Sequence, residues 1–161
     1  MELKKLDKSF YAANPVLIQA LDFDMKSKAW FSGDKVRGHG IVQITLHGLT
    51  FAIPVRSNIQ HSESFILEIC RDPARKIKGM GLDYSKAVLL RDAGHVSNEV
   101  FVLRTKGAGK KLVGKEAHIT RMFSKYVNKY IKAVKEDDKR ILNSDGFRYT
   151  TLVNYHPELG L

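Results

Sequence analysis

The sequence contains one cysteine among its 161 residues and no long apolar run, and both absences narrow the possible classes of protein. Cys70 cannot form an internal disulfide, and its place in the apolar run 65–70 indicates a buried thiol in a reducing compartment. No stretch has the length and apolarity of a membrane-spanning helix. Residues 1–10 lack the apolar segment of a secretory signal. We therefore expect a cytoplasmic protein.

Acidic residues are scarce relative to basic ones: 17 Asp and Glu stand against 27 Lys and Arg, which gives a net charge of +10. The excess is concentrated in residues 104–135, which hold ten basic residues and a single acid, Glu116. Such a surface attracts a polyanion. Nucleic acid fits better than a membrane, because no basic helix displays an exposed aromatic face.

Residues 1–161 show no internal repeat, low-complexity tract or linker, so we expect a single domain. A turn at His47-Gly48 joins two alternating segments into a predicted β-hairpin. Asn14-Pro15 predicts the start of a short helix that ends near Leu21. The strands expected from alternation and apolar runs cover residues 1–6, 40–46, 49–55, 65–70, 87–90 and 99–103.

In the second half of the chain the apolar period changes from two to 3.6, which predicts a long helix over residues 114–138. Its apolar face is expected to consist of Ile119, Met122, Phe123, Tyr126, Val127, Tyr130 and Val134. The opposite face carries Arg121, Lys125, Lys129, Lys132 and Lys135. Residues 71–80 and 106–111 read as basic loops, the second of them mobile, and the cap-like Asp145 predicts a last short helix. Together these elements indicate an α+β fold with about five or six strands.

The segment FAIPVRSNIQH, residues 51–61, gathers the side chains of greatest chemical interest. Pro54 removes a backbone donor and is expected to end the regular ladder, so that the residues after it face a cleft. Arg56 offers a forked donor for phosphate, Ser57 a hydroxyl, and His61 a group that exchanges protons near neutral pH. For each residue alone, a polar exit from a strand is the simpler interpretation; the cluster in a basic chain favours an anion-handling site.

Two other patterns do not support a site. Residues 106–111, KGAGKK, lack the wider glycine spacing and the Ser or Thr of a phosphate-binding loop. Asp22 and Asp24 have no third ligand nearby in the sequence, so we predict no metal site and no cofactor. RNA can be cleaved without a metal when its own 2′-hydroxyl is the nucleophile. The segment with Lys35, Arg37 and His39 precedes the hairpin and is expected to lie on the same side as residues 56–61.

Over nearly its whole length the sequence resembles the toxins of type III toxin–antitoxin systems, the ToxN/AbiQ superfamily, and most closely its TenpN and CptN branches. The strings that carry the resemblance are LKKLDKSFYAAN, FAIPVRSNIQH, GLDYSKAVLL and TTLVNYHPELGL. The resemblance implies a metal-independent endoribonuclease with a compact, highly twisted antiparallel sheet flanked by helices. It also implies a structured, tandem-repeat antitoxin RNA, which the toxin cuts from its precursor and holds in a closed protein–RNA assembly. Members inhibit bacterial growth and act in abortive defence against phage.

Within this resemblance Ser57 matches the key serine of the family. Arg56 stands where the ToxN branch has a threonine, and Asn58 and His61 are the candidates where that branch has a lysine. Lys35 or Arg37 is the nearest match to a second lysine, and the choice between them stays open, as does the choice of general base and general acid. The predicted catalytic set is therefore Ser57, Arg56, His61, Lys35 and Arg37. The predicted RNA-binding set is His39, Asn58, Lys76, Lys78, Lys110, Lys111, Arg121, Lys125, Lys129 and Lys132.

The leading hypothesis is a sequence-selective endoribonuclease that leaves a 2′,3′-cyclic phosphate and a 5′-hydroxyl, with cellular or phage RNA as substrate. A non-catalytic RNA-binding protein would have the same charge and the same basic helix. A metal-dependent nuclease is a third possibility, disfavoured by the lack of a carboxylate cluster in the sequence.

Overall fold

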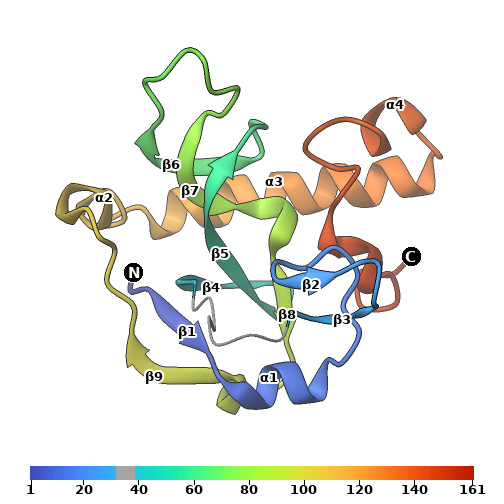
Figure 1. The fold of residues 1–161 in the computed structure, drawn as a ribbon. Coiled ribbons are helices and arrows are strands. Elements are labelled where there is room, and N and C mark those ends of the chain that lie inside the picture. The colour runs from blue at the N-terminus through green and yellow to red at the C-terminus, as the bar shows by residue number, and fades with distance from the viewer. Residues whose placement is uncertain (32–38) are drawn as a thin grey trace.

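The computed structural model describes residues 1–31 and 39–161 and has at its centre an antiparallel seven-stranded sheet. The strand order is β6-β7-β5-β4-β1-β9, and β8 also pairs with β5 (Figure 1). A separate small sheet pairs β2 (Phe23–Asp24) with β3 (Ala29–Trp30). The α+β class predicted from the sequence is confirmed. The strands of the main sheet are β1 (Lys4–Leu6), β4 (Ile41–Leu46), β5 (Leu49–Ile59), β6 (Ser64–Ile69), β7 (Gly79–Asp83), β8 (Val88–Leu90) and β9 (Val96–Val100).

The β4–β5 hairpin forms as predicted, with His47 and Gly48 as its turn. Both residues have positive φ, 52° and 77°, as a two-residue type I′ turn requires. Strands near residues 1–6, 65–70 and 87–90 are also confirmed, whereas β9 begins and ends three residues before the predicted 99–103.

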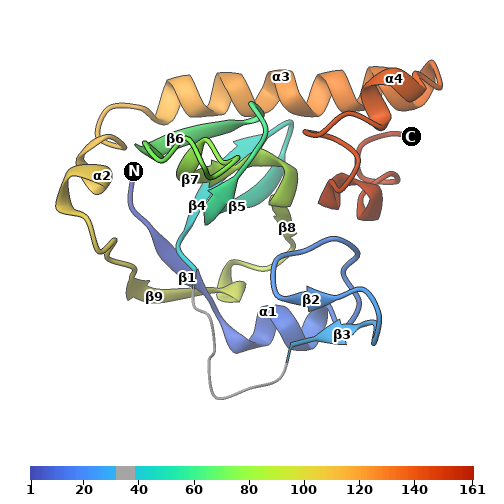
Figure 2. The same ribbon diagram turned by 45° about the horizontal axis from the view of Figure 1, so that its top comes forward.

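The predicted long helix is α3 (Glu116–Lys135), and it packs on one side of the sheet while α1 (Lys8–Ala13) lies on the other (Figure 2). Phe123 of α3 meets Phe51 of β5 with ring centroids 5.3 Å apart. The predicted basic face of α3 is exposed, and Met122 is the one predicted apolar residue that stays largely at the surface. The remaining helical segments are α2 (Lys106–Lys110), α4 (Lys139–Leu142) and the 3₁₀ turns η1 (Tyr84–Lys86), η2 (Ala93–His95) and η3 (Thr151–Asn154).

Three predicted segments differ from the structure. The helix expected over residues 14–21 is wrong, because α1 lies earlier: the Asp7 side chain caps it and Asn14 ends it. The loop expected over residues 106–111 contains α2. The tail from Asp145, expected to form a last short helix, contains only the 3₁₀ turn η3, which Thr150 caps in place of Asp145; the unpredicted α4, which Asp138 caps, lies before it.

Strand β7 was not predicted, because its sequence GMGLD has no alternating pattern. Its two glycines, Gly79 and Gly81, allow the backbone of β6 to approach closely. A Cβ on Gly79 would lie 2.0 Å from the carbonyl oxygen of Glu68, and one on Gly81 would lie 2.1 Å from that of Phe65. Because β7 lies between β5 and β6, it carries its last residue, Asp83, into the middle of the sheet.

Candidate functional site

Strand β5 carries the predicted site, and it runs through Pro54 instead of ending there. Along one edge β5 pairs with β4 as far as Pro54. Along the other edge it pairs first with β8, up to Ala52, and then with β7, from Val55 onward. The missing N–H of Pro54 therefore falls where β5 changes partners, and the ladder continues beyond it.

The pairing of β5 with β7 is irregular at the centre of the predicted site. Arg56 pairs with Gly81 and Ile59 pairs with Gly79, so Ser57 and Asn58 together oppose the single residue Met80. This two-against-one arrangement is a β-bulge, a feature that turns side chains away from the regular alternation. Both bulge residues are exposed.

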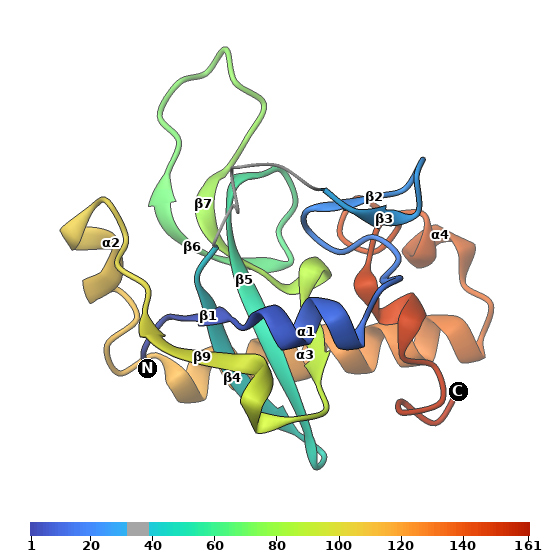
Figure 3. The ribbon, with the colours of Figure 1, turned by 60° about the horizontal axis from the view of Figure 1, so that its bottom comes forward.

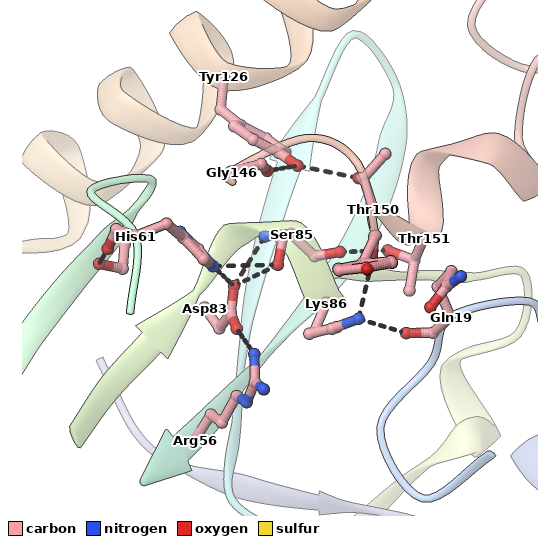
Figure 4. Close-up of polar contacts among 12 residues, drawn as sticks. Gln19, Arg56, His61, Asp83, Ser85, Lys86, Tyr126, Gly146, Thr150 and Thr151 are labelled. Atoms are coloured by element: carbon pink, nitrogen blue, oxygen red, sulfur yellow. Dashed lines mark hydrogen bonds and ion pairs between the residues drawn. The ribbon is translucent and has the colours of Figure 1, made fainter. Parts of the chain in front are cut away.

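The neighbours of the bulge contact a carboxylate that sequence reasoning missed, Asp83 at the end of β7 (Figure 4). Arg56 Nη1 donates to Asp83 Oδ2 at 3.0 Å, and His61 Nε2 lies 3.2 Å from Asp83 Oδ1. Ser85 contributes its backbone N–H at 3.0 Å and its hydroxyl at 2.6 Å, both to Oδ1. The predicted pair Arg56 and His61 is thus brought together, but on an internal anion and not on an open surface.

Asp83 is fully buried, with 0% of its surface exposed. Burial raises the pKa of its carboxyl, but the hydrogen bonds and charge of His61 and the hydrogen bonds of Ser85 and Arg56 outweigh burial, so the pKa lies below the usual 3.8. His61 is only 9% exposed, and its Nδ1 is buried without a hydrogen-bond partner among the described residues. The Arg56 side chain is 35% exposed.

Ser57 and Asn58 line a separate open cleft with a volume of about 860 Å³. Its walls come from the end of β5, from β6 and β7, from the loop between those two strands and from residues 101–105. The long β6–β7 loop, which contributes Arg75 and Ile77 to the cleft, projects from the sheet (Figure 3). The polar side chains of the cleft are those of His39, Ser57, Asn58, Glu68, Arg75, Arg104 and Thr105.

Within the cleft, two contacts orient polar groups. Arg75 Nη2 donates to Asn58 Oδ1 at 3.4 Å, which ties the β6–β7 loop to the bulge. His39 Nδ1 lies 3.5 Å from Asp22 Oδ2. Cys70 also lines the cleft and is half-buried, so the prediction of a buried thiol is wrong. Lys35 and Arg37 lie outside the described residues.

The remaining predicted RNA-binding residues are exposed and dispersed over several elements. Lys76 and Lys78 lie on the β6–β7 loop, Lys110 and Lys111 at the end of α2, and the rest on α3. On α3, Lys129 is partly neutralised, because its Nζ lies 3.8 Å from a carboxylate oxygen of Glu63. The α3 residues are Arg121, Lys125, Lys129 and Lys132.

Lys86 is another residue that the sequence did not point to, and it is buried beside the contacts of Asp83 (Figure 4). Its Nζ donates to the backbone oxygens of Gln19 and Tyr149, both at 2.8 Å. It thereby joins η1 to two loops distant in the sequence. Burial lowers the pKa of Lys86 to about 8; the charge of Asp83 opposes this shift and that of Arg56 adds to it.

The lowered pKa of Lys86 makes the free energy of unfolding depend on pH. The folded chain binds the Lys86 proton less tightly than the unfolded chain does, so the contribution of this residue to stability rises as the pH rises from about 8 towards 10.5. Between about pH 7 and about pH 9.5, the wild type should gain about 2 kcal/mol over a Lys86→Met variant. Urea unfolding of both proteins across this range measures the difference, and parallel stability curves would contradict the assignment.

Asp83, Ser85 and Lys86 belong to the string GLDYSKAVLL, and their polar character within an apolar run was the available signal. Arg75 and Arg104 gave no signal beyond charge. Among residues 1–31 and 39–161, no three His, Cys, Asp or Glu side chains are grouped to hold a metal ion. In the same residues, no helix combines the length and apolarity needed to span a bilayer. Comparison of the chain with protein-family models, with curated proteins and with solved structures found no match.

Proposed function

We propose that this protein is an endoribonuclease that cleaves RNA without a metal ion, through attack of the substrate's own 2′-hydroxyl on the adjacent phosphate. The cleft is the observation that carries the proposal. It is lined by Ser57, His39, Arg75 and Arg104, together with Glu68, and the His39 side chain is 16% exposed. A site that cleaves RNA in this way needs a proton acceptor and a proton donor, together with groups that neutralise the negative charge of the phosphorane.

The reaction assigns each group a task. A base takes the proton of the 2′-hydroxyl as the O2′–P bond forms, and an acid protonates the 5′-oxygen as the P–O5′ bond breaks. In this proposal His39, beside Asp22, does both in turn: its neutral imidazole takes the proton of the 2′-hydroxyl, and the resulting imidazolium returns that proton to the 5′-oxygen. Ser57 hydrogen-bonds the scissile phosphate or the attacking oxygen, and the two arginines neutralise charge. The products are a 2′,3′-cyclic phosphate and a 5′-hydroxyl.

Arg56 and His61 take a different place in this proposal from the one expected from the sequence. Neither residue lines the cleft, and both contact Asp83. The proposal therefore keeps Ser57 in contact with substrate and assigns the acid–base task to His39 in place of His61.

The test is incubation of the purified protein with single-stranded RNA in EDTA, followed by analysis of the product ends. Cleavage that leaves a cyclic phosphate, and that stops when the nucleotide at the cut carries a 2′-deoxy sugar, supports the proposal. RNA bound but not shortened would indicate a non-catalytic binding protein. Cleavage that requires added divalent metal would indicate a metal-dependent nuclease.

We further propose that the protein acts in the bacterial cytoplasm as the toxin of a type III toxin–antitoxin system, which the quoted sequence strings and the exposed basic face of α3 support. The partner would be a structured antitoxin RNA of tandem repeats. A short tandem-repeat array followed by a terminator, directly upstream of the coding sequence, would support this proposal. Growth inhibition that no upstream RNA relieves would contradict it.

Replacement of Lys125, Lys129 and Lys132 by glutamine should weaken RNA binding and reduce its salt dependence. Each phosphate contact releases counterions and contributes about 0.7 to the slope of log affinity against log salt on single strands. The slope should therefore fall by up to about 2. The cleaved bond should not change, because phosphate contacts position the strand and base contacts specify it. Helix α3 should persist, since its apolar face is untouched.

A matched control removes the same charge elsewhere, at the exposed Lys8, Lys26 and Lys28. Binding measured by titration at several salt concentrations should separate the two triple variants. Equal slopes for both would show that α3 faces solvent in the complex and that RNA binds over another surface, such as the β6–β7 loop.

A further inference from the structure

We propose that Asp83 is a positioning residue, which clamps both ends of the segment 56–61 and thereby holds Ser57 and Asn58 in the cleft. Arg56 immediately precedes the bulge, and His61 follows it by three residues. One carboxylate contacts both, at 3.0 Å through Oδ2 and at 3.2 Å through Oδ1. This inference rests on the proposed function, because it assigns a task within the same site.

The backbone explains why the segment needs a clamp. β4 stops pairing with β5 at Pro54, and the ladder with β7 skips Ser57 and Asn58. Both residues are exposed and unpaired in the ladder, so their backbone is fixed only by the flanking pairs, Arg56 with Gly81 and the buried Ile59 with Gly79, and by the contact of Asn58 with Arg75. Such a segment belongs to the part of a protein that opens locally at low cost, unless other contacts hold it.

The anchor itself is held by several contacts within the core. Asp83 caps η1: its Oδ1 accepts the backbone N–H and the hydroxyl of Ser85, and the carboxylate is fully buried. The next residues continue into the core, since Thr151 donates to the backbone oxygen of Ser85 at 3.2 Å and Lys86 holds two further loops. A carboxylate fixed in this way holds Arg56 and His61 in place relative to the core, and through these two residues it fixes the position of the bulge.

The clamp affects the cleavage rate through the position of the Ser57 hydroxyl. Ser57 is useful in the reaction only if its hydroxyl stays close to one position, and a misplacement of about 1 Å costs about 100-fold in rate. Arg104 makes no hydrogen bond or ion pair with Asp83 or with the bulge, and Arg75 contacts the bulge only through Asn58, at 3.4 Å. Most of the contact with the RNA backbone should therefore persist without Asp83. Loss of the clamp should therefore lower kcat and leave KM nearly unchanged.

The experiment compares Asp83→Asn with the matched control Asp145→Asn, which alters an exposed carboxylate that also pairs with an arginine, Arg148. We expect kcat of Asp83→Asn for RNA cleavage in EDTA to fall about 10- to 100-fold, with KM within about threefold of wild type. The control should match the wild type in both constants. A kcat of Asp83→Asn within twofold of wild type would overturn the inference.

Amide hydrogen exchange supplies a readout that does not depend on catalysis. In Asp83→Asn the amides of residues 57–60 should exchange faster, while those of α3 and β4 keep their protection. If the wild type does not cleave RNA, the proposed function fails, and the exchange measurement still decides whether the clamp exists. Unchanged exchange at residues 57–60 would overturn the clamp even in an active enzyme.

Ser85→Ala keeps the inference testable if Asp83→Asn folds poorly, and variants of Arg56 and His61 extend the test where Asp83→Asn folds. Ser85→Ala removes one donor from the anchor and should give a smaller change of the same kind in kcat and in exchange. Arg56→Met and His61→Gln each remove one arm of the clamp. In the Asp83→Asn background, neither should lower kcat further, because residues acting as a unit are not additive. Full additivity of these effects would show that Arg56 and His61 act independently of Asp83.

Discussion

Ser57→Ala is expected to lower the rate of RNA cleavage about 100- to 1,000-fold, which is the usual cost of losing one well-placed polar group in a transition state. The proposed growth inhibition should disappear with it. The fold should be unaffected, because Ser57 is exposed in the cleft and no core contact depends on its hydroxyl. RNA binding should also persist, since Arg75 and Arg104 remain. Cleavage rate, thermal unfolding and RNA affinity measured on the same preparation separate these effects.

Ser62→Ala is the matched control for this variant. Ser62 is exposed on the turn between β5 and β6, within five residues of Ser57, and it does not line the cleft. The same loss of a hydroxyl there should leave cleavage and growth inhibition at the wild-type level. If Ser57→Ala cleaves RNA as the wild type does, the hydroxyl is not part of the reaction and the proposed site loses its central residue.

The local parts of the fold could be predicted from the sequence because short-range periodicity determines them. His47-Gly48 between two alternating segments specified the β4–β5 hairpin, and the apolar spacing from Ile119 to Tyr130 specified α3. β7 was missed for the opposite reason. Its glycines are required by the close approach of the neighbouring β6 backbone, and the alternating apolar pattern is therefore lost.

The candidate site could be located from the sequence but not assembled. Arg56 and Ser57 are adjacent, and the strand continues past Pro54, so their side chains are directed to different surroundings: Arg56 to Asp83 and Ser57 to the cleft. An interpretation that ended the strand at Pro54 placed both in one cluster. Asp83 comes 27 positions after Arg56, and only the pairing of β5 with β7 brings the two together.

Asp83→Ala is expected to reduce the free energy of unfolding by about 3 kcal/mol, at the lower end of the range for breaking a buried ion pair. The full range reaches about 5 kcal/mol when the partner charge stays buried. Here Arg56 is 35% exposed and can regain water, which lowers the cost. The donor groups of Ser85 and His61 are buried, so water replaces their lost acceptor less easily. Urea denaturation near neutral pH measures the change.

Asp145→Ala provides the comparison, because its carboxylate is 75% exposed and pairs with Arg148 at the surface, where an ion pair contributes at most about 1 kcal/mol. The pH dependence supplies a second check. Since the pKa of Asp83 is lower in the folded chain than its usual 3.8, its stabilisation is complete above that value and is lost as the pH falls through the lower, folded pKa. The gap in stability between wild type and Asp83→Ala should therefore not shrink between neutral pH and about pH 5, and it should shrink below about pH 4. A gap that shrinks already near neutral pH would mean that Asp83 is protonated there, and that the contacts with Arg56 and His61 do not hold its charge.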